Sequence, residues 1–269
     1  KEEEIMIRTN LFASTDARRV VSKEGRYSLV EYEKDMSVSP DMAMKAYYAS
    51  KMNVRKRQVI AQLNNDGGVI LQAGAMQMMI GNLEASSNIK GAGDLMRKFM
   101  GSTVTGESAV KPRYVGSGLL VLEPTYNYII FEDLANWNGN MCIEDGMFLA
   151  CDDSVNIQVT ARSNLSSALL GNEGLFNTAL TGRGIAVLES PVPAEELIVV
   201  ELENDTIKID GSMAIAWSNN LQFTVERTTN SLIGSAASGE GLVNVYRGTG
   251  RILIAPVAAN SGISAPKVG

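Results

Sequence analysis

The sequence Gly-Ser-Gly-Leu-Leu-Val-Leu-Glu-Pro at residues 116–124 is closely repeated by Gly-Arg-Gly-Ile-Ala-Val-Leu-Glu-Ser at residues 182–190. The second stretch begins 66 residues after the first, and Gly-Thr-Gly at 248–250 begins 66 residues later still. The phrase is either a phosphate-binding loop used three times or a corner of a repeated scaffold. Phosphate loops need a third glycine and a helix directly after it, whose amides meet the anion. An apolar, strand-like run follows here instead, so we predict a corner between strands, where glycine allows a sharp bend.

Two further turns recur along the chain in the same order as the Gly-x-Gly phrase. A glycine turn between apolar residues and a glutamate turn precede it, at Gly74 and Glu107, Gly146 and Glu173, and Gly211 and Glu240. Three ordered markers in triplicate predict a threefold internal duplication. The predicted structural turns are Gly74, Gly146, Gly211, Gly116, Gly118, Gly182, Gly184, Gly248 and Gly250.

The duplication also predicts the domain organisation. We expect one β domain at 42–257, with repeats at about 52–118, 119–184 and 185–250 and a closing strand to 257. An N-terminal extension at 1–41 and a flexible tail at 258–269, rich in Ser, Gly, Pro and Ala, flank this domain.

Short aliphatic runs bounded by Gly, Pro, Asn or Asp predict strands throughout the repeats, at 185–188, 197–200, 221–227 and 252–254. Turn signals every eight to twelve residues are typical of sandwiches and barrels, so the fold class is all-β. Residues 27–33 alternate like an added strand, and 64–68 have the composition of a hairpin turn. Helices are expected at 42–52, after the capping sequence Ser39-Pro40-Asp41, and in small-residue segments before each glutamate turn, at 91–101, 164–170 and 231–237.

The overall composition excludes several classes of function. The chain of 269 residues carries a net charge of −6 and no histidine. Its acidity argues against non-specific binding to nucleic acid or an anionic membrane. Without histidine there is no Ser/His or Cys/His nucleophile, and the usual transition-metal ligand is missing. An enzyme resembling the cupin oxygenases, whose sites are built on histidine, is therefore the least favoured class.

The location of the protein follows from two negative signals. No run reaches the 18 apolar residues of a membrane span. The first residues, Lys-Glu-Glu-Glu, lack the basic-then-apolar layout of a signal peptide, so we expect a cytoplasmic protein.

The candidates for chemistry each have a structural alternative. Glu107, Glu173 and Glu240 would form a Ca²⁺ or Mg²⁺ site if they gathered around a pseudo-threefold axis. The alternative, which we favour, is that each accepts backbone amides in its own turn. Adjacent acids at 132–133, 144–145 and 152–153 lack the spacing of a calcium loop and are interpreted as solvated turns.

The remaining unusual residues are also interpreted as structural. The basic run Arg55-Lys56-Arg57 is expected at a solvated strand end. Cys142 and Cys151 are expected to be small apolar residues in strands, with a disulfide or redox pair as the alternative. The thirteen methionines are expected in the core or at a subunit interface, with an adaptable binding surface as the alternative.

The glycine motifs also carry a family resemblance. Asn-Glu-Gly-Leu-Phe at 172–176 and Gly-Glu-Gly-Leu-Val at 239–243, each followed by Gly-x-Gly, together with Gln-Ala-Gly-Ala-Met at 72–76, resemble a family signature. The chain is similar over 42–257 to the mitochondrial-biogenesis family of "altered inheritance of mitochondria" proteins, member twenty-four. The resemblance implies a pseudo-threefold arrangement of three β-sandwich repeats, each a short double-stranded β-helix like the subunit of the trp RNA-binding attenuation protein. It implies no catalytic residue and no cofactor, and it does not transfer RNA or tryptophan binding, because fold does not carry function.

Together these features favour a non-catalytic, oligomeric scaffold or protein-interaction protein, whose partner is either itself or another protein. The alternative is a small-ligand or divalent-ion binding module that uses clefts between repeats. RNA binding inherited with the fold is less favoured, and we expect no enzyme activity and no nucleic-acid partner.

Overall fold

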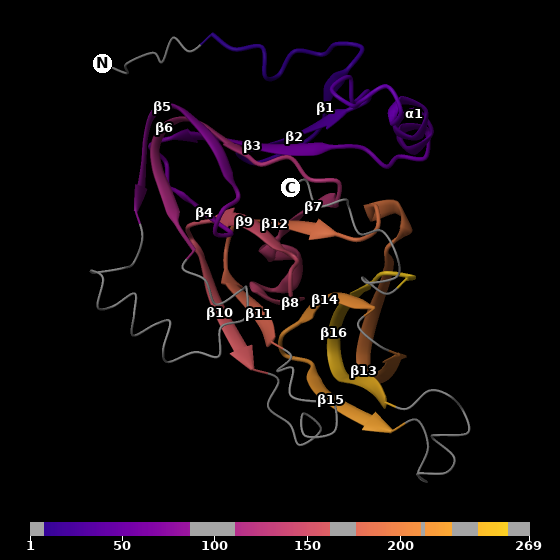
Figure 1. Cartoon of the computed structure of the whole chain (residues 1–269). Coiled ribbons are helices and arrows are strands. Elements are labelled where there is room, and N and C mark those ends of the chain that lie inside the picture. The colour runs from indigo at the N-terminus through magenta and orange to yellow at the C-terminus, as the bar shows by residue number, and fades with distance from the viewer. Residues whose placement is uncertain (1–7, 87–110, 162–175, 211–212, 228–241, 258–269) are drawn as a thin grey trace, which may run out of the picture. The chain divides into compact units, whose positions relative to one another are not determined.

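The computed structural model describes residues 8–86, 111–161, 176–210, 213–227 and 242–257. The protein is mostly β, as the sequence predicts, with two curled antiparallel sheets and, among the described residues, one α-helix (Figure 1). The chain divides into two compact units, each built around one sheet. The first unit contains Lys1–Phe131, Leu149–Ser154 and Ile185–Glu189, and the second contains Glu132–Phe148, Val155–Gly184 and Ser190–Gly269.

The sheet of the first unit has nine strands in the order β1-β2-β3-β6-β4-β9-β12-β7, with β5 paired to β6. It curls almost into a barrel, because Arg57 at the start of β3 exchanges backbone hydrogen bonds with Thr125, just before β7. The strands are β1 (Arg18–Glu24), β2 (Tyr27–Tyr32), β3 (Arg57–Asn64), β4 (Val69–Leu71), β5 (Met76–Ser86), β6 (Arg113–Leu122), β7 (Tyr128–Asp133), β9 (Phe148–Asp152) and β12 (Ile185–Ser190).

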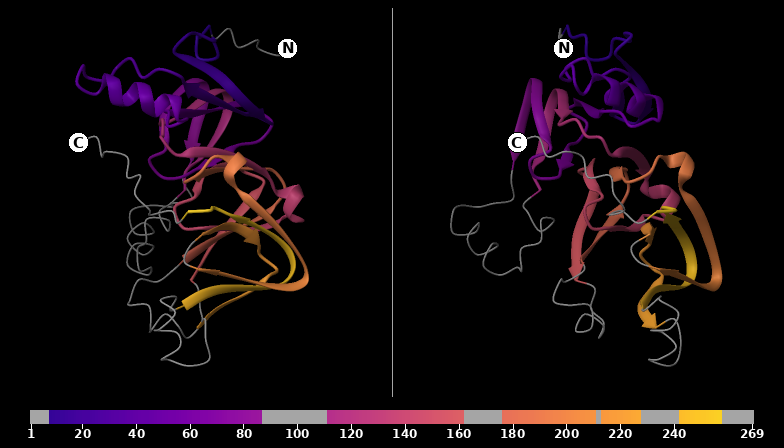
Figure 2. Two further views of the ribbon diagram at one scale, coloured as in Figure 1. Left: turned by 90° about the vertical axis from the view of Figure 1, so that its right-hand side faces the viewer. Right: turned by 45° about the vertical axis from the view of Figure 1, so that its right-hand side comes forward.

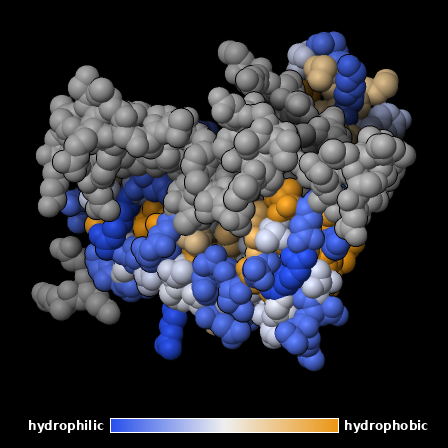
Figure 3. Space-filling model, turned by 90° about the horizontal axis from the view of Figure 1, so that it is seen from below, coloured by the Kyte–Doolittle hydropathy of each residue, from blue (hydrophilic) through white to orange (hydrophobic). Residues whose placement is uncertain are grey.

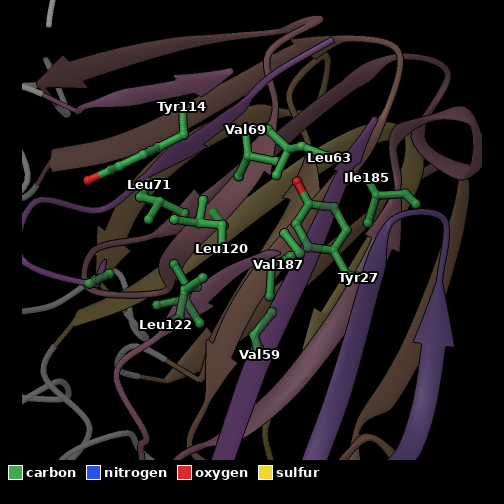
Figure 4. Close-up of a cluster of buried hydrophobic side chains, with 14 of the residues drawn as sticks. Tyr27, Val59, Leu63, Val69, Leu71, Tyr114, Leu120, Leu122, Ile185 and Val187 are labelled. Carbon is green, nitrogen blue, oxygen red and sulfur yellow. The ribbon is translucent and has the colours of Figure 1, made fainter. Parts of the chain in front are cut away.

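The core of the first unit lies on the inner face of this sheet (Figure 4). Alternate residues of a strand point to opposite faces, so Leu120 and Leu122 of β6 enter this core. Val121, between them, joins a second buried cluster on the other face with Val30 and Ile60. The last four residues of β6, 119–122, are therefore buried on both faces of the sheet. The members of this cluster that Figure 4 labels are Tyr27, Val59, Leu63, Val69, Leu71, Tyr114, Leu120, Leu122, Ile185 and Val187.

The N-terminal part of the chain adds strands β1 and β2 and the helix α1 (Ala43–Lys51). The helix expected at 42–52 is thus confirmed, but Ser39 does not cap it with its side chain. The residue at the cap position is Met42, whose N–H donates to the Ser39 carbonyl in a preceding turn. The strand expected at 27–33 is confirmed as β2, although residues 27–31 are all buried rather than alternately buried, because β2 contributes to both clusters.

The second unit contains a seven-stranded sheet in the order β10-β11-β8-β14-β16-β13, with β15 paired to β16. Figure 2 shows the strong curl of its long strands β13 and β16. Its core includes an aromatic group of Trp217, Phe223 and Tyr246, with ring centroids 5.2–6.4 Å apart. The strands are β8 (Asn140–Glu144), β10 (Val155–Ala161), β11 (Phe176–Gly182), β13 (Ile198–Asp210), β14 (Ala214–Ser218), β15 (Gln222–Arg227) and β16 (Leu242–Ile254), with the short 3-10 helices η2 (Leu134–Trp137) and η3 (Ala194–Glu196).

The same strand arrangement occurs in three successive sections of the chain. Along the chain, each section has a leading strand, then the glycine turn, then a trailing strand, and last the strand that carries Gly-x-Gly. We call this last strand the central strand, because the leading strand pairs with one of its edges and the trailing strand with the other. The leading, trailing and central strands are β3/β4, β5 and β6 in the first section, β7/β8, β9/β10 and β11/β12 in the second, and β13, β14/β15 and β16 in the third.

The prediction of a hairpin turn at 64–68 is wrong. Residues 64–68 were expected to form a hairpin turn, but β3 and β4 do not pair with each other. Both lie along the same side of β6, with Asn64 opposite Ser117 and Val69 opposite Tyr114. The turn therefore joins two collinear pieces of one leading strand, and its composition could not distinguish this from a hairpin because both need positive φ angles.

Candidate functional site

The repeated glutamates Glu107, Glu173 and Glu240 lie outside the described residues. Within the described ranges no group of three or more Asp, Glu, Cys or His side chains could hold a metal ion. The divalent-ion site therefore stays a prediction from the sequence.

The repeated glycines take two kinds of position. Gly74 and Gly146 lie in tight turns with φ of +82° and +80°, whereas Gly211 is outside the described part of the chain. The Gly-x-Gly phrases lie at residues 116–118 within β6, at 182–184 where β11 ends at Gly182 and β12 begins at Ile185, and at 248–250 within β16. Two of the three are thus inside continuous strands, which corrects the expected corner between strands.

In the first section, the glycines permit a close approach of two backbones. A Cβ at Gly116 would lie 2.2 Å from the Asn82 carbonyl oxygen, and one at Gly118 would lie 2.1 Å from the Ile80 carbonyl oxygen. No side chain fits at such distances. The phrase therefore seats β5 on β6, a role that the sequence alone did not indicate.

A hollow of about 390 Å³ opens beside Gly116, within the first unit. Its charged lining groups are the carboxylate of Glu84 and the guanidinium of Arg113. Arg113 Nε donates to Asp153 at 2.8 Å. Partial burial raises the pKa of Asp153. Hydrogen bonds from the Gly68 backbone and Arg113 have a larger, opposite effect, so the pKa is below its ordinary value. The lining residues are Asn65, Gly67, Asn82, Glu84, Arg113, Val115 and Gly116.

This hollow offers both donors and acceptors to a ligand. With one carboxylate and one guanidinium it is not a bare cation site, because Ca²⁺ takes six to eight oxygen ligands, several of them carboxylate. It suits a small polar molecule. All its residues fall in the predicted repeat 52–118, so it is not a cleft between predicted repeats.

Asp152 is not in a solvated turn, contrary to the sequence interpretation. Its carboxylate accepts from Arg26 Nε at 3.0 Å, from the Tyr27 hydroxyl at 3.2 Å and from the Ile185 N–H at 2.9 Å. Burial, and then the charge of Asp152, raise the pKa of Tyr27 well above its ordinary value. These bonds join β2, β9 and the start of β12, so Asp152 has a structural role.

The basic run is not at a solvated strand end either. The Arg57 side chain is only 3% exposed, and its Nη2 lies 3.1 Å from Glu31 and donates to Asn53 at 2.8 Å. Its guanidinium also lies 4.2 Å from the centroid of the Tyr128 ring. Because β2 pairs with β3 and places Glu31 opposite Arg57, the added strand supplies the counter-charge. The sequence could not show this pairing.

The cysteine prediction is confirmed. Cys142 and Cys151 form no disulfide and are buried, in β8 and β9. Burial raises the pKa of the Cys151 thiol strongly, so the nucleophilic thiolate is suppressed.

The exposed large apolar side chains of the first unit include groups on α1 and on β5. Helix α1 buries none of its residues, and Met44, Tyr47 and Tyr48 are each 59–73% exposed. On β5, Met78 and Met79 are 39% and 41% exposed. By contrast, the coloured atoms on the face shown in Figure 3 are mostly hydrophilic, with hydrophobic atoms in small separate groups. The exposed apolar side chains on α1 and β5 are the best candidates for contact with another protein.

None of the helices in the described ranges is long and apolar enough to cross a membrane.

Comparison with known proteins gives one consistent result. The sequence model of the mitochondrial biogenesis AIM24 family matches residues 50–257, which confirms the resemblance carried by the glycine motifs. An uncharacterized protein of Streptococcus pyogenes serotype M6 is 31% identical over 200 residues, which cover 71% of this chain and 78% of that protein. A crystal structure of a Streptococcus pyogenes protein superposes with a TM-score of 0.56 at 28% identity, covering 76% of this chain and 89% of the other.

Proposed function

Because the chain belongs to the mitochondrial biogenesis AIM24 family, we propose that it is a non-catalytic, oligomeric scaffold that acts through contacts between proteins. The observation that carries this proposal is the exposure of large apolar side chains on α1 and β5. A helix without a single fully buried residue gains little stability from packing, although packing of an apolar face is the main source of helix stability in proteins. Its methionine and two tyrosines are of the kinds that interfaces favour.

We propose further that the β domain is three tandem copies of one three-strand unit. The support is the arrangement of leading, central and trailing strands, which recurs in each third of the chain. A unit with its glycine-bearing strand in the middle is consistent with the implied likeness to the trp RNA-binding attenuation protein, with its short β-sandwich repeats in a pseudo-threefold arrangement.

Light scattering over a wide range of protein concentration tests the oligomeric scaffold. We expect a mass above the 28.9 kDa of one chain, rising with concentration if the association is weak. A Tyr47→Ser, Tyr48→Ser variant tests α1 as a contact, since it removes aromatic surface from exposed positions without touching the core. Val21→Ser, at a 40% exposed position on β1, is the matched control. A strictly monomeric wild-type protein at every concentration excludes self-assembly.

A second candidate function is the binding of a small polar ligand in the hollow beside Gly116. The opposite charges of Glu84 and Arg113 in its lining favour it. Thermal shift screening of small zwitterionic metabolites against the wild-type protein and Glu84→Gln tests this function. We expect a ligand to raise the Tm of the wild-type protein and to lose most of that effect with the variant. Equal rises in Tm for the wild-type protein and Glu84→Gln would exclude the hollow as the binding site.

A further inference from the structure

We propose that β5 of one molecule pairs with residues 205–210 of β13 in a second copy of the chain, so that molecules join head to tail. This inference rests on the proposed oligomeric function and assigns the edges that carry it. The partner is another copy because the chain already makes the same strand pairing twice within itself.

The first internal example joins the first section to the second. The second half of the leading strand, β4, pairs antiparallel with the first half of the next trailing strand, β9, with Leu71 opposite Ala150. The second example joins the second section to the third, where β8 pairs antiparallel with β14 and Ile143 lies opposite Ala216. In both examples, a leading strand pairs side by side with the trailing strand of the following section.

The pattern leaves one trailing strand and one leading strand without this partner. Among the described strands, β5 pairs with β6 alone, and β13 pairs with β16 alone. They are the trailing strand of the first section and the leading strand of the last. Each therefore presents an outer edge of backbone N–H and C=O groups, which is a template for another strand.

Side-chain exposure marks the same edge of β5. Counted from the glycine turns at Gly74 and Gly146, Met78 and Met79 correspond to Ala150 and Cys151. The latter two are fully buried at 0% exposure, because β4 covers their strand. Met78 and Met79 are 39% and 41% exposed. The difference is what a missing neighbouring strand would produce.

The glycine turns also give the register. Leu71 and Ile143 each precede their glycine turn by three residues, and Lys208 precedes Gly211 by three. The partner of Leu71 is Ala150, four residues after Gly146. The partner of Ile143 is Ala216, five residues after Gly211. Lys208 should therefore lie opposite Met78 or Met79. Since residues 76–82 carry no charge, no like charges meet across 205–210 in this register.

Strand β1, at one end of the same sheet, is protected against edge pairing, and β5 is not. Strand β1 contains Arg18, Arg19, Lys23 and Glu24 within seven residues, and it is interrupted by a bulge near Val20. Charges and bulges of this kind prevent edge-to-edge pairing. In β5, a bulge occurs only near Met76, and the first charge is Glu84.

Disulfide trapping between two different molecules tests the register. Lys208→Cys protein is mixed with Met78→Cys or Met79→Cys protein and oxidised, and we expect a cross-linked dimer in at least one mixture. Lys208→Cys mixed with Val21→Cys is the control, since Val21 is similarly exposed at 40% but lies on the protected edge. The two natural cysteines are buried and form no disulfide. Cross-linking no greater than in the control overturns the proposed pairing.

Light scattering on a Met78→Lys, Met79→Lys variant separates this inference from the proposed function. We expect the variant to move from the wild-type oligomer to the 28.9 kDa monomer, while Val21→Lys keeps the wild-type mass. Circular dichroism checks that both variants are folded. A folded variant with the wild-type oligomeric mass overturns the β5–β13 pairing but leaves the oligomeric scaffold standing. A monomeric wild-type protein overturns both.

Discussion

Gly118 of β6 lies opposite Gly81 of β5, and a Cβ at Gly118 would stand 2.1 Å from the carbonyl oxygen of Ile80. The atom nearest to this added Cβ belongs to the backbone of β5. A change of side-chain rotamer therefore cannot relieve the clash. The first copy of the Gly-x-Gly phrase is thus a packing device for a long edge strand.

Gly118→Ala should therefore lower the free energy of unfolding by about 2–5 kcal/mol, since overpacking and an unfavourable φ of +154° act together. Chemical denaturation measures the change. Gly74→Ala is the control, because its φ is +82° but nothing lies within 4 Å of the added Cβ. It should cost about 1–2 kcal/mol through backbone strain alone. If the two variants lost the same free energy of unfolding, the close approach of β5 to Gly118 would have no effect on stability.

The buried pair of Glu31 and Arg57 should be sensitive to the loss of one partner. Glu31→Gln leaves the 3% exposed guanidinium of Arg57 without its counter-charge, and we expect a loss of about 3–5 kcal/mol in unfolding free energy. The double variant Glu31→Gln, Arg57→Met should lose less than the sum of the single variants. The exposed pair of Arg19 and Glu33 is the control, and Arg19→Met should cost no more than about 1 kcal/mol. Additive losses at residues 31 and 57 would contradict the coupling.

The stability of the first unit should depend on pH through Asp35. Partial burial raises the pKa of this carboxyl, but hydrogen bonds from Ser37, Lys56 and Tyr126 lower it more, to about 2. The folded pKa is below the unfolded value, so the stabilisation is complete above pH 4 and is lost as pH falls toward 2. The loss is about 2 kcal/mol. Asp35→Asn should flatten the stability profile between pH 4 and 2, and an unchanged profile would remove Asp35 as its cause.

The native protein should resist thiol reagents. Cys142 and Cys151 are 3% and 0% exposed, and burial suppresses the Cys151 thiolate, so modification requires opening of the strands. We expect no labelling by a thiol-reactive chromophore at pH 8 within minutes, and two labels per chain in denaturant. Rapid labelling of the folded protein would contradict their burial.

The all-β class, helix α1 and several strands could be predicted from the sequence because they depend on local signals. Aliphatic runs between turn residues predicted β12 and β16, and Ser39-Pro40-Asp41 placed the start of the helix within a few residues. The candidate site could be predicted only in part. The methionines of β5 were noticed as interface candidates, but no sequence pattern identified the hollow beside Gly116, since its residues come from three separate stretches.

By itself the sequence determined that one short phrase recurs at a fixed interval, because duplication leaves its turns in the same order. What each copy of that phrase does was decided by tertiary structure. Gly118 matters through the carbonyl of Ile80, Arg57 is buried because β2 brings Glu31 opposite it, and Asp152 is held by Arg26 and Tyr27. The physical reason is that strand pairing joins residues far apart in the chain, and no local pattern records which strand will lie beside another.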